Sequence, residues 1–523
     1  MTLDDLGDVT ECEQLTGVFD EAHKLACMDQ CLDGCMDNIN TWIDREDTVD
    51  RVPPTAVVRC AKGGKTTVLA TLFQRLKDHE SYWPIIISFN GSSHVWRPVE
   101  EECEKSLLRH IAHALLKENH PGKATGLKDM SCEAATLNEY FQRCRNQKVK
   151  VVLIIDELNM LLPAGPRTPD ASAWKAAAFL KNTFLKAEGG YLVFSSHVQR
   201  AATQLEEYMD SESGRGLLIQ SLPIASRLEE LTSIDHNCAG LTSARAAYYG
   251  NLPSLVYVAS KHRSWTPQKE FAKAQLGETH RDLLASFTAE VLTGHAESVA
   301  GPTVPFARLT DRVSSTEVRW IPCYMSPLLR SCGQGPLHDW LERLTSAEKN
   351  DGKAWEAVVA VAFGLRYLHV ALRAVPAHEF LGKIDRSITV QILDCPSTVT
   401  TLGAALPFAY STLKGTDNCV CLCRPTHSGF ELIDLFACWR RDGHTQLLMV
   451  AQTKQGRDRQ LTKLPPEVEG GVPAWWLNGL APAERQWSEK DETKPRWTIP
   501  SASEVQGFLG PSLRVCSPRD WVP

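Results

Sequence analysis

A glycine-rich turn that ends in lysine and threonine constrains this 523-residue chain more than any other stretch. The apolar pair Val57-Val58 leads into the turn, and Gly63-Gly64-Lys65-Thr66-Thr67 opens a run with a helical pattern. Strand, turn and helix N-terminus in this order predict a loop whose backbone N–H groups bind phosphate. Glycine suits such a loop because it has no Cβ to hold the phosphate oxygens away from the backbone.

The residues of this loop also predict the ligands that it binds. Lys65 is expected to reach the β- and γ-phosphates of ATP, and the Thr66 hydroxyl is expected to coordinate Mg²⁺. The usual pattern is G-x-x-x-x-G-K-[ST], whereas Arg59 stands here at the position of the first glycine. An ordinary glycine-rich turn is the alternative interpretation.

A second motif lies further along the chain, where the apolar run 151–155 ends in Asp156 and Glu157. A continuous apolar run is typical of a strand that is buried on both faces of a parallel sheet. Open α/β sheets bind their ligands at such strand ends. Asp156 is therefore expected to hold the Mg²⁺ shell, and Glu157 to polarise the attacking water. A core strand followed by a solvated loop is the alternative.

Residues 51–225 alternate between strand and helix patterns, which predicts a domain with a parallel sheet and right-handed crossovers. Further strands are expected at 83–90, 190–197 and 217–219, and helices near 100–118, 134–146 and 171–187. The predicted fold class is α/β, a P-loop NTPase similar to the AAA and STAND branches. A helical lid is expected to follow over residues 226–300.

Two further positions are candidates for contact with the nucleotide. Ser196, near the end of the strand at 190–197, is the candidate for sensing the γ-phosphate, with Ser195 and His197 as neighbouring choices. Hydroxyls that only cap the strand end are the alternative. Pro253 in Gly250-Asn251-Leu252-Pro253 resembles the G-x-P element of STAND lids, or simply begins a helix. Arg200 is either an arginine finger or a solvated side chain.

The C-terminal third, residues 346–523, carries three pieces in a recognisable order. A helical run at 353–363 contains Glu356, an apolar run at 430–436 contains Asp434, and a strand pattern ends in Gln452-Thr453-Lys454. Helix-Glu, strand-Asp and strand-[D/E/Q]-x-Lys is similar to the order found in restriction-endonuclease-like domains. An α+β domain with a purely structural role is the alternative.

This order predicts a second magnesium site. Asp434 and Gln452 are expected to bind Mg²⁺, and the alternation of a strand places Gln452 and Lys454 on one face. Lys454 would orient or deprotonate water, and Glu356 would add a metal contact or a brace. An amide oxygen binds Mg²⁺ less strongly than a carboxylate, so Gln452 predicts slow or absent cleavage. Phosphate contact, or merely a solvated face, is expected for the basic residues Arg440, Arg441, Lys454, Arg457, Arg459 and Lys463.

Charge and cysteine content indicate the compartment and the partners. The net charge of the chain is −7: residues 1–50 carry −12 and the remaining residues carry +5. The helical, acidic segment 1–50 could bind a protein. No signal-peptide pattern and no run of 18 apolar residues occurs, so we expect no membrane contact. The 17 cysteines indicate a reduced intracellular compartment, although an unconventional route of secretion stays open.

Two groups of regularly spaced cysteines invite a metal interpretation. Cys27, Cys31 and Cys35 recur on one helix stripe, whereas Cys419, Cys421 and Cys423 alternate along a strand with His427 nearby. Neither spacing has the C-x₂-C form that is usual for zinc. We therefore favour packing in a core over metal binding for both groups.

Taken together, these motifs resemble the Crinkler-type effectors and the related retrotransposon hot spot proteins. The resemblance covers about residues 51–460, and it implies an ATPase joined to a nuclease-like domain that acts on DNA or RNA, often in a nucleus. The resemblance implies that Lys65, Thr66, Asp156 and Glu157 bind the nucleotide. It implies that the nuclease site consists of Glu356, Asp434, Gln452 and Lys454. The chain departs from the family at its start, where no ubiquitin-like header is seen.

The expected domains are residues 1–50 (acidic segment), 51–225 (NTPase), 226–300 (lid), 301–345 (linker or border loops) and 346–523 (nuclease-like). The function predicted is ATP turnover coupled to action on nucleic acid. One alternative is a nucleotide-gated interaction protein whose nuclease-like domain is inactive. A second is an AAA-like remodelling ATPase that assembles as a ring.

Overall fold

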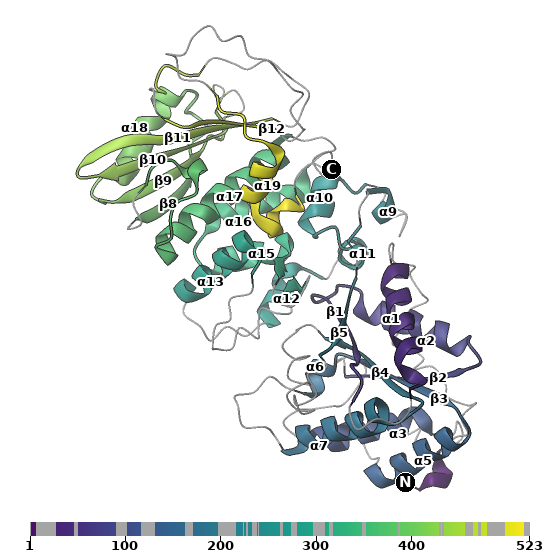
Figure 1. Cartoon of the computed structure of the whole chain (residues 1–523). Helices are drawn as coiled ribbons and strands as arrows, with labels where there is room; N and C mark the ends of the chain where they lie inside the picture. Colours follow the sequence, from purple (N-terminus) through teal and green to yellow (C-terminus); the bar gives the residue numbers. More distant parts are fainter. Residues whose placement is uncertain are drawn as a thin grey trace. The chain divides into compact units, whose positions relative to one another are not determined.

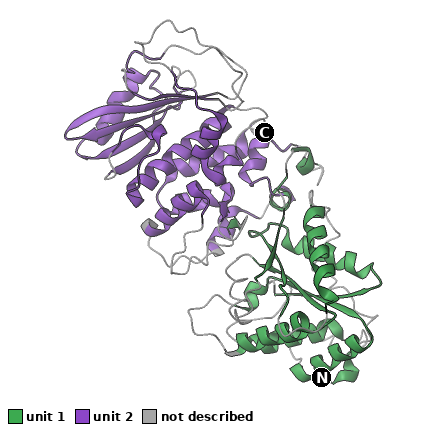
Figure 2. Ribbon diagram, viewed as in Figure 1, with its two compact units in different colours: residues 1–236, 253–258, 302–315 green, residues 237–252, 259–301, 316–523 purple. Residues whose placement is uncertain are grey.

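A computed structural model gives the fold in two compact units (Figure 2). Unit 1 comprises residues 1–236, 253–258 and 302–315, and unit 2 comprises residues 237–252, 259–301 and 316–523. Each unit has a hydrophobic core and a sheet of its own. The structure describes residues 2–6, 28–45, 51–89, 102–116, 131–162, 171–196, 216–222, 224–225, 228–232, 238, 240–261, 265–273, 280–295, 309–312, 317–347, 352–384, 388–427, 430, 433–454, 464–468, 472–478 and 497–516.

Unit 1 is built on a five-stranded parallel sheet with the order β2-β3-β4-β1-β5 (Figure 1). The strands are β1 (Thr55–Val58), β2 (Tyr82–Ser88), β3 (Lys150–Asp156), β4 (Gly190–Ser196) and β5 (Leu218–Ser221). The apolar runs of β1 to β4 are buried along nearly their whole length, as expected for strands covered on both faces. The predicted parallel sheet is confirmed.

Helices cover both faces of this sheet (Figure 1). α1 (Met28–Ile43) and α2 (Lys65–Lys77) pack together on one face. The other face carries α3 (Cys103–Leu115), α5 (Ala134–Asn146) and α7 (Ala171–Leu180), which the π-helix η3 (Lys181–Lys186) continues. Unit 1 also contains η1 (Leu3–Asp5), α6 (Leu158–Leu161), α9 (Leu228–Thr232) and β6 (Thr310–Arg312).

Unit 2 begins with a group of helices. They are α10 (Ser243–Tyr248), α12 (Pro267–Lys273) and α13 (His280–Thr293). The short strand β7 (Val318–Trp320) follows. Helix α11 (Pro253–Lys261) starts in unit 1 and ends in unit 2.

Residues 301–345 were expected to be a linker or border loops, and this was wrong for residues 322–345. They form α15 (Pro322–Ser331) and α16 (Gly335–Ser346), and both helices bury large side chains such as Tyr324 and Trp340. Pro322 occupies the first turn of α15, where a proline is favoured because it has no N–H to pair there. The Pro, Ser and Gly content that suggested a linker therefore lies at helix starts, in turns and, at Ser326 and Pro327, inside α15.

The second sheet belongs to unit 2 and has the order β12-β11-β10-β9-β8. β8 (Thr389–Asp394) and β9 (Cys419–Arg424) are parallel, whereas β10 (Leu435–Arg441) is antiparallel to both β9 and β11 (His444–Lys454). β12 (Ala474–Asn478) is parallel to β11. The ends of β8, β9, β11 and β12 therefore lie at the same edge of the sheet as the start of β10.

The longest helix of unit 2 is α17 (Gly352–Arg373). Its length and composition would suffice to cross a membrane. However, 72% of its most apolar 18-residue stretch is buried inside the structure. It contacts α13, α16 and strands of the second sheet, so it is apolar on most of its sides. The remaining elements are α18 (Leu402–Leu413), η6 (Glu379–Leu381) and α19 (Ala502–Arg514).

The boundaries of β10 correct one detail of the sequence analysis. Asp434 lies one residue before the strand and not within it, because the pairing with β11 starts at Leu435. The two strands are joined by a tight turn in which Asp442 has φ 51° and Gly443 has φ 77°. Positive φ at both central residues is what a two-residue hairpin turn requires.

The cysteines with regular spacing pack in the cores. Cys31 and Cys35 are buried on α1, while Cys27 lies outside the described residues. Cys419, Cys421 and Cys423 are buried in β9, in a cluster beneath α18.

Candidate functional site

The phosphate loop joins β1 to α2 and has the backbone that its glycines predicted. Gly64 has φ 93°, a conformation that strains any residue with a Cβ, and α2 starts at the next residue. At Gly63 a Cβ would lie 2.2 Å from Cγ of Arg59 and 2.9 Å from the carbonyl oxygen of Cys60. The loop therefore closes so tightly on itself that only glycine fits at this position.

Lys65 lies inside this loop. Its side chain is only 4% exposed, and its Nζ donates to the carbonyl oxygens of Arg59 (3.1 Å) and Cys60 (3.0 Å). A buried ammonium at the start of α2 adds its charge to the positive end of that helix. The loop thus presents a fixed positive charge where a phosphate group would bind.

The acidic strand end lies directly beside the loop. The hydroxyl of Thr66 donates to Oδ2 of Asp156 (2.8 Å), and the hydroxyl of Ser195 donates to Oδ1 (2.6 Å). Ser88, at the end of β2, donates to Oδ2 over 3.4 Å. The strand order brings these groups together, because β4 lies between β1 and β3. Ser88 was missed in the sequence, and only its place at a strand end could have indicated it.

Asp156 is fully buried, at 0% exposure. Burial raises the pKa of its carboxyl group, and the charge of Glu157 raises it further, whereas the hydrogen bonds from Ser195 and Thr66 and the charge of Lys65 lower it. A carboxylate in such surroundings gains most from a cation that replaces its lost hydration.

Glu157 adopts a left-handed backbone conformation with φ 57° and ψ 51°. Its backbone N–H donates to the hydroxyl of Ser195 (2.9 Å), which in turn bonds Asp156. A non-glycine residue in this conformation costs of order 1–3 kcal/mol and persists where its surroundings fix it. The turn after β3 is therefore held by the same serine that orients the acid.

Arg59, which stands in place of the usual first glycine, is part of a buried ion pair. Its Nε lies 3.2 Å from Oδ1 of Asp311 in β6, and the two side chains are only 2% and 4% exposed. Asp311 is remote in the sequence, and no local pattern marked it as a partner of the loop. The loop is thus braced by a charge pair that the usual glycine motif does not contain.

The remaining predicted nucleotide residues are placed as follows. Pro253 begins α11, and the neighbouring Ser254 donates to the carbonyl oxygen of Lys62 in the loop (2.6 Å). Ser196 is buried at the end of β4, and its carbonyl oxygen accepts from the N–H of Arg59 (3.4 Å). Thr67 lies in the first turn of α2. His197 and Arg200 lie outside the described residues.

The residues at this site fit a magnesium ion. Thr66 and Asp156 offer a hydroxyl and a carboxylate, the hard oxygen donors that Mg²⁺ prefers. They are already within hydrogen-bond distance of each other (2.8 Å), and the buried carboxylate has the raised pKa described above. Both residues would therefore hold the ion.

The predicted nuclease residues lie at the shared edge of the second sheet. Glu356 is in the first turns of α17, whose neighbouring Trp355 donates to the carbonyl oxygen of Leu477 in β12 (3.3 Å). Gln452 is buried near the end of β11, and Lys454 is the last residue of that strand. Asp434 precedes β10, opposite this end of β11. All four positions therefore lie at one edge of the second sheet.

The contacts of Asp434 are made to Thr453, between Gln452 and Lys454. Its Oδ2 accepts from the backbone N–H (2.6 Å) and from the hydroxyl (2.9 Å) of Thr453. Since side chains alternate along a strand, Thr453 lies on the face opposite to Gln452. One oxygen of the predicted metal ligand is thus engaged by the strand itself.

Two residues that the sequence analysis missed complete this edge. Arg424 at the end of β9 pairs with Asp394 at the end of β8, over 3.4 Å between Nε and Oδ1. Trp340 donates its Nε1 hydrogen to the same Oδ1 (2.8 Å), and its ring lies 5.3 Å from the guanidinium of Arg424. We call Glu356, Asp394, Arg424 and Asp434 the strand-end cluster. Only the parallel pairing of β8 and β9 brings Asp394 and Arg424 together.

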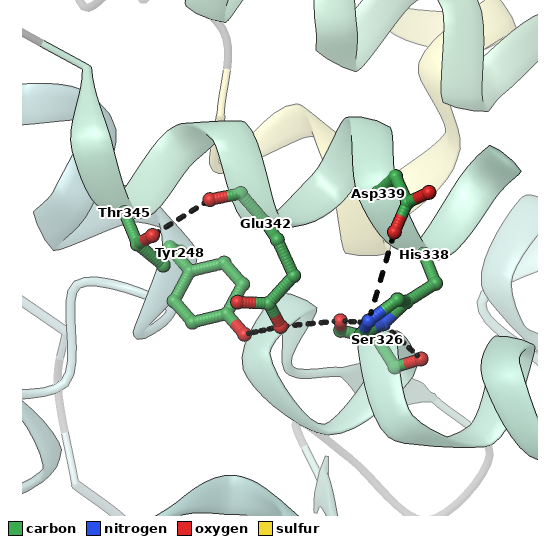
Figure 3. Close-up of polar contacts among 6 residues, drawn as sticks. All are labelled: Tyr248, Ser326, His338, Asp339, Glu342 and Thr345. Atoms are coloured by element: carbon green, nitrogen blue, oxygen red, sulfur yellow. Dashed lines mark hydrogen bonds and ion pairs between the residues drawn. The ribbon is translucent and has the colours of Figure 1, made fainter. Parts of the chain in front are cut away.

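A further polar network in unit 2 joins α10, α15 and α16 (Figure 3). Glu342 accepts from the hydroxyls of Tyr248 (2.5 Å) and Ser326 (2.5 Å), and Ser326 lies 2.7 Å from Nδ1 of His338. Asp339 is 3.9 Å from Nε2 of that ring. Burial raises the pKa of Tyr248 well above its ordinary value. Ser326 is fully buried and its hydroxyl donates to Glu342. Ser326, His338 and Asp339 therefore tie helices together, and Ser326 does not act as a nucleophile.

The basic run of the C-terminal third is described only in part. Arg440 donates to the carbonyl oxygen of Leu413 (3.4 Å), and Arg441 lies 3.3 Å from Asp442 and over the ring of Trp439. Arg457, Arg459 and Lys463 lie outside the described residues.

No protein-family model and no curated protein matches the sequence. Solved structures similar to the chain include the Walker-type ATPase of Pyrococcus abyssi, at 10% identity and TM-score 0.35 over 62% of this chain and 99% of that one. The ORC2 protein of Aeropyrum pernix is similar at 12% identity and TM-score 0.32, over 61% and 93% of the two chains. Cdc6p of Pyrobaculum aerophilum is similar at 12% identity and TM-score 0.27, over 65% of this chain and 98% of that one. TM-scores this low do not by themselves establish a shared fold.

The class of unit 1 therefore follows from its own geometry. A five-stranded parallel sheet has a glycine-rich loop after β1, a helix that starts with Lys65-Thr66, and an acid at the end of β3 that contacts this threonine. Unit 1 has the fold of a P-loop NTPase. Unit 2 adds helices and a separate mixed sheet.

Proposed function

We propose that unit 1 binds ATP together with Mg²⁺ and hydrolyses it. The observation that carries this proposal is the contact between Thr66 and Asp156 (2.8 Å), which joins the phosphate loop to the acidic strand end. The buried Lys65 supports it, because a lysine that is enclosed by loop carbonyls is positioned for anionic phosphate. When bound, Mg²⁺ would neutralise charge on the phosphate oxygens.

The protein groups have distinct roles in this proposal. Backbone N–H groups of the loop and the start of α2 would bind the β-phosphate, and Lys65 would reach the β- and γ-phosphates. Thr66 and Asp156 would hold the ion, with Ser195 fixing the orientation of Asp156. Glu157 would orient the attacking water, and its strained turn would hold it in place. Ser196 and Pro253 stay candidates for contact with the nucleotide.

For unit 2 we propose that ATP turnover controls its action on DNA or RNA. Strands β9 to β12 follow α17, and their successive pairings (antiparallel, antiparallel and parallel) support a nuclease-like arrangement. The placement of Glu356, Asp434, Gln452 and Lys454 at one sheet edge supports it too. The resemblance to Crinkler-type effectors suggests a nuclear site of action.

The ATPase proposal is tested with Lys65→Ala. We expect the steady-state ATPase rate to fall by about 10²–10³-fold, because a preorganised positive group at the phosphates is removed. Lys77→Ala is the matched control, since Lys77 is exposed in the last turn of the same helix and should leave the rate unchanged. Wild-type turnover by Lys65→Ala would show that the loop assignment is wrong.

A further inference from the structure

We propose that Ser254 and Asp311 are positioning residues of the phosphate loop, which comprises residues 59–64 between β1 and α2. On this proposal the affinity of unit 1 for ATP depends on two side chains from outside the NTPase domain expected at 51–225. The inference rests on the ATPase function proposed for unit 1. It deepens that function because it names the groups that hold the loop in its phosphate-binding shape.

The hydrogen bonds inside the loop meet at one carbonyl group. The carbonyl oxygen of Cys60 accepts from the N–H of Gly63 (3.1 Å) and from Nζ of Lys65 (3.0 Å). The carbonyl oxygen of Arg59 is the second acceptor for Lys65 (3.1 Å). The place of the lysine that would reach the phosphates therefore depends on where the backbone of the loop lies.

Ser254 fixes this backbone at Lys62. Its hydroxyl donates to the carbonyl oxygen of Lys62 (2.6 Å), and the residue is buried. Lys62 has φ 58°, a left-handed conformation that a residue with a Cβ keeps only where its surroundings hold it. The peptide group between Lys62 and Gly63 is bonded at both ends, because its oxygen accepts from Ser254 and its N–H donates to Cys60. Rotation of this peptide would therefore break two hydrogen bonds.

Asp311 acts on the loop through Arg59. Its Oδ1 lies 3.2 Å from Nε of Arg59, and both side chains are almost fully enclosed. Arg59 touches the loop twice: its Cγ lies where Gly63 has no room for a Cβ, and its carbonyl oxygen accepts from Lys65. A buried guanidinium needs a charged partner, so Asp311 decides where this side chain lies. Loss of the pair would release the side chain that packs against the tightest turn of the loop.

Both positioning residues belong to stretches of chain that enter unit 1 between parts of unit 2. Residues 253–258 and 302–315 are assigned to unit 1, and the residues on either side of each stretch are assigned to unit 2. Each stretch places one side chain on the loop or on its arginine. A displacement of either stretch would therefore change the loop, which is how we infer that the nucleotide site is regulated.

Titration of the full chain with a fluorescent, slowly hydrolysed ATP analogue and Mg²⁺ tests the proposal. Ser254→Ala should weaken binding by about three- to tenfold, as expected for the loss of one hydrogen bond that shapes the loop. Ser254→Thr keeps the hydroxyl and should bind like the wild type. Asp311→Asn should weaken binding by about tenfold or more, because Arg59 loses its partner.

Asp311→Asn also separates positioning from simple electrostatics. Removal of a negative charge near the loop would by itself strengthen the binding of an anionic nucleotide, whereas loss of positioning weakens it. Adding Arg59→Gly removes both charges of the pair and restores the glycine of the usual motif, so the affinity should return toward that of the wild type. Wild-type or tighter binding by Asp311→Asn, or wild-type affinity in Ser254→Ala, would overturn the proposal.

Two matched controls lie in unit 2. Asp442→Asn removes an acid that lies 3.3 Å from Arg441, and Ser411→Ala removes a hydroxyl that donates to a backbone carbonyl oxygen in α18. Neither should change the affinity. Circular dichroism and the number of binding sites report the folded fraction, so a purely structural role would lower that number and leave the Kd unchanged. If Asp311→Asn unfolds the chain, Ser254→Ala decides alone, since it removes a single hydroxyl.

The same titration separates this inference from the function on which it rests. No binding by the wild type, or equal binding by the wild type and Lys65→Ala, would refute the ATPase function and the inference with it. Loss of binding in Lys65→Ala, with wild-type affinity in Ser254→Ala and Asp311→Asn, would leave the ATPase function standing and refute the inference.

Discussion

A buried ion pair stands where the phosphate loop of a P-loop NTPase usually has its first glycine. Arg59 and Asp311 are 3.2 Å apart and almost fully enclosed. Removing one member of such a pair leaves the other as an uncompensated buried charge, which typically costs about 3–5 kcal/mol. The side chain of Arg59 also lies against Gly63, so the pair supports the loop where it is tightest.

We therefore expect Asp311→Ala to lower the free energy of unfolding of unit 1 by about 3–5 kcal/mol. Arg59→Gly restores the usual motif and removes the charge that needs a partner. In the double variant the loss should consequently be much smaller than the sum of the two single losses. Urea unfolding of the wild type, both single variants and the double variant gives this coupling. Additive losses would show that the two residues do not act as a pair.

At the scale of elements, a histidine caps the short helix η6 beside α17 and α19. Nδ1 of His378 accepts a hydrogen bond from the N–H of Phe380 (3.3 Å), which requires an unprotonated nitrogen. The ring also packs against Phe508 of α19. Burial, and next the charge of Arg366, lower the pKa of His378 to about 4.

This shift predicts how the stability of unit 2 depends on pH. The folded form binds the proton less readily than the unfolded form, whose histidine has a pKa of about 6.5. The contribution of His378 is thus complete above about pH 6.5 and is lost as the pH falls toward about 4. As the pH is lowered from about 6.5 to about 4, the denaturant midpoint should fall less in His378→Asn than in the wild type. The asparagine can still cap η6. Identical pH profiles would exclude this role.

At the scale of the whole molecule, the two compact units allow ligand effects to be assigned. A ligand that binds only the folded form of one unit stabilises that unit by about 2.7 kcal/mol at a hundred times its Kd. We expect Mg²⁺ and ATP together to raise the temperature of the unfolding transition that belongs to unit 1.

Differential scanning calorimetry with and without Mg²⁺ and ATP measures this effect. Lys65→Ala is the control, and its transitions should not respond to the nucleotide. An equal response in the wild type and in Lys65→Ala would place the binding site elsewhere.

The sequence by itself determined those features that depend on neighbours along the chain. Glycines and a lysine at fixed spacing specify the loop, and apolar runs that end in polar residues specify the buried parallel strands. Local patterns also located α3 and α5 within a few residues. The same local reasoning failed at residues 322–345, because Pro322 at a helix start resembles a linker proline in composition.

Only the tertiary structure decided which distant groups meet. The order of the strands brings Ser88 and Ser195 to Asp156, and β6, which lies outside this sheet, brings Asp311 to Arg59. The pairing of β8 with β9 likewise places Arg424 among carboxylates that the sequence suggested for a metal. Such contacts join residues from separate elements, and the charge balance at a site depends on all of them. Motif spacing therefore indicates where chemistry can occur, whereas packing decides which charges meet there.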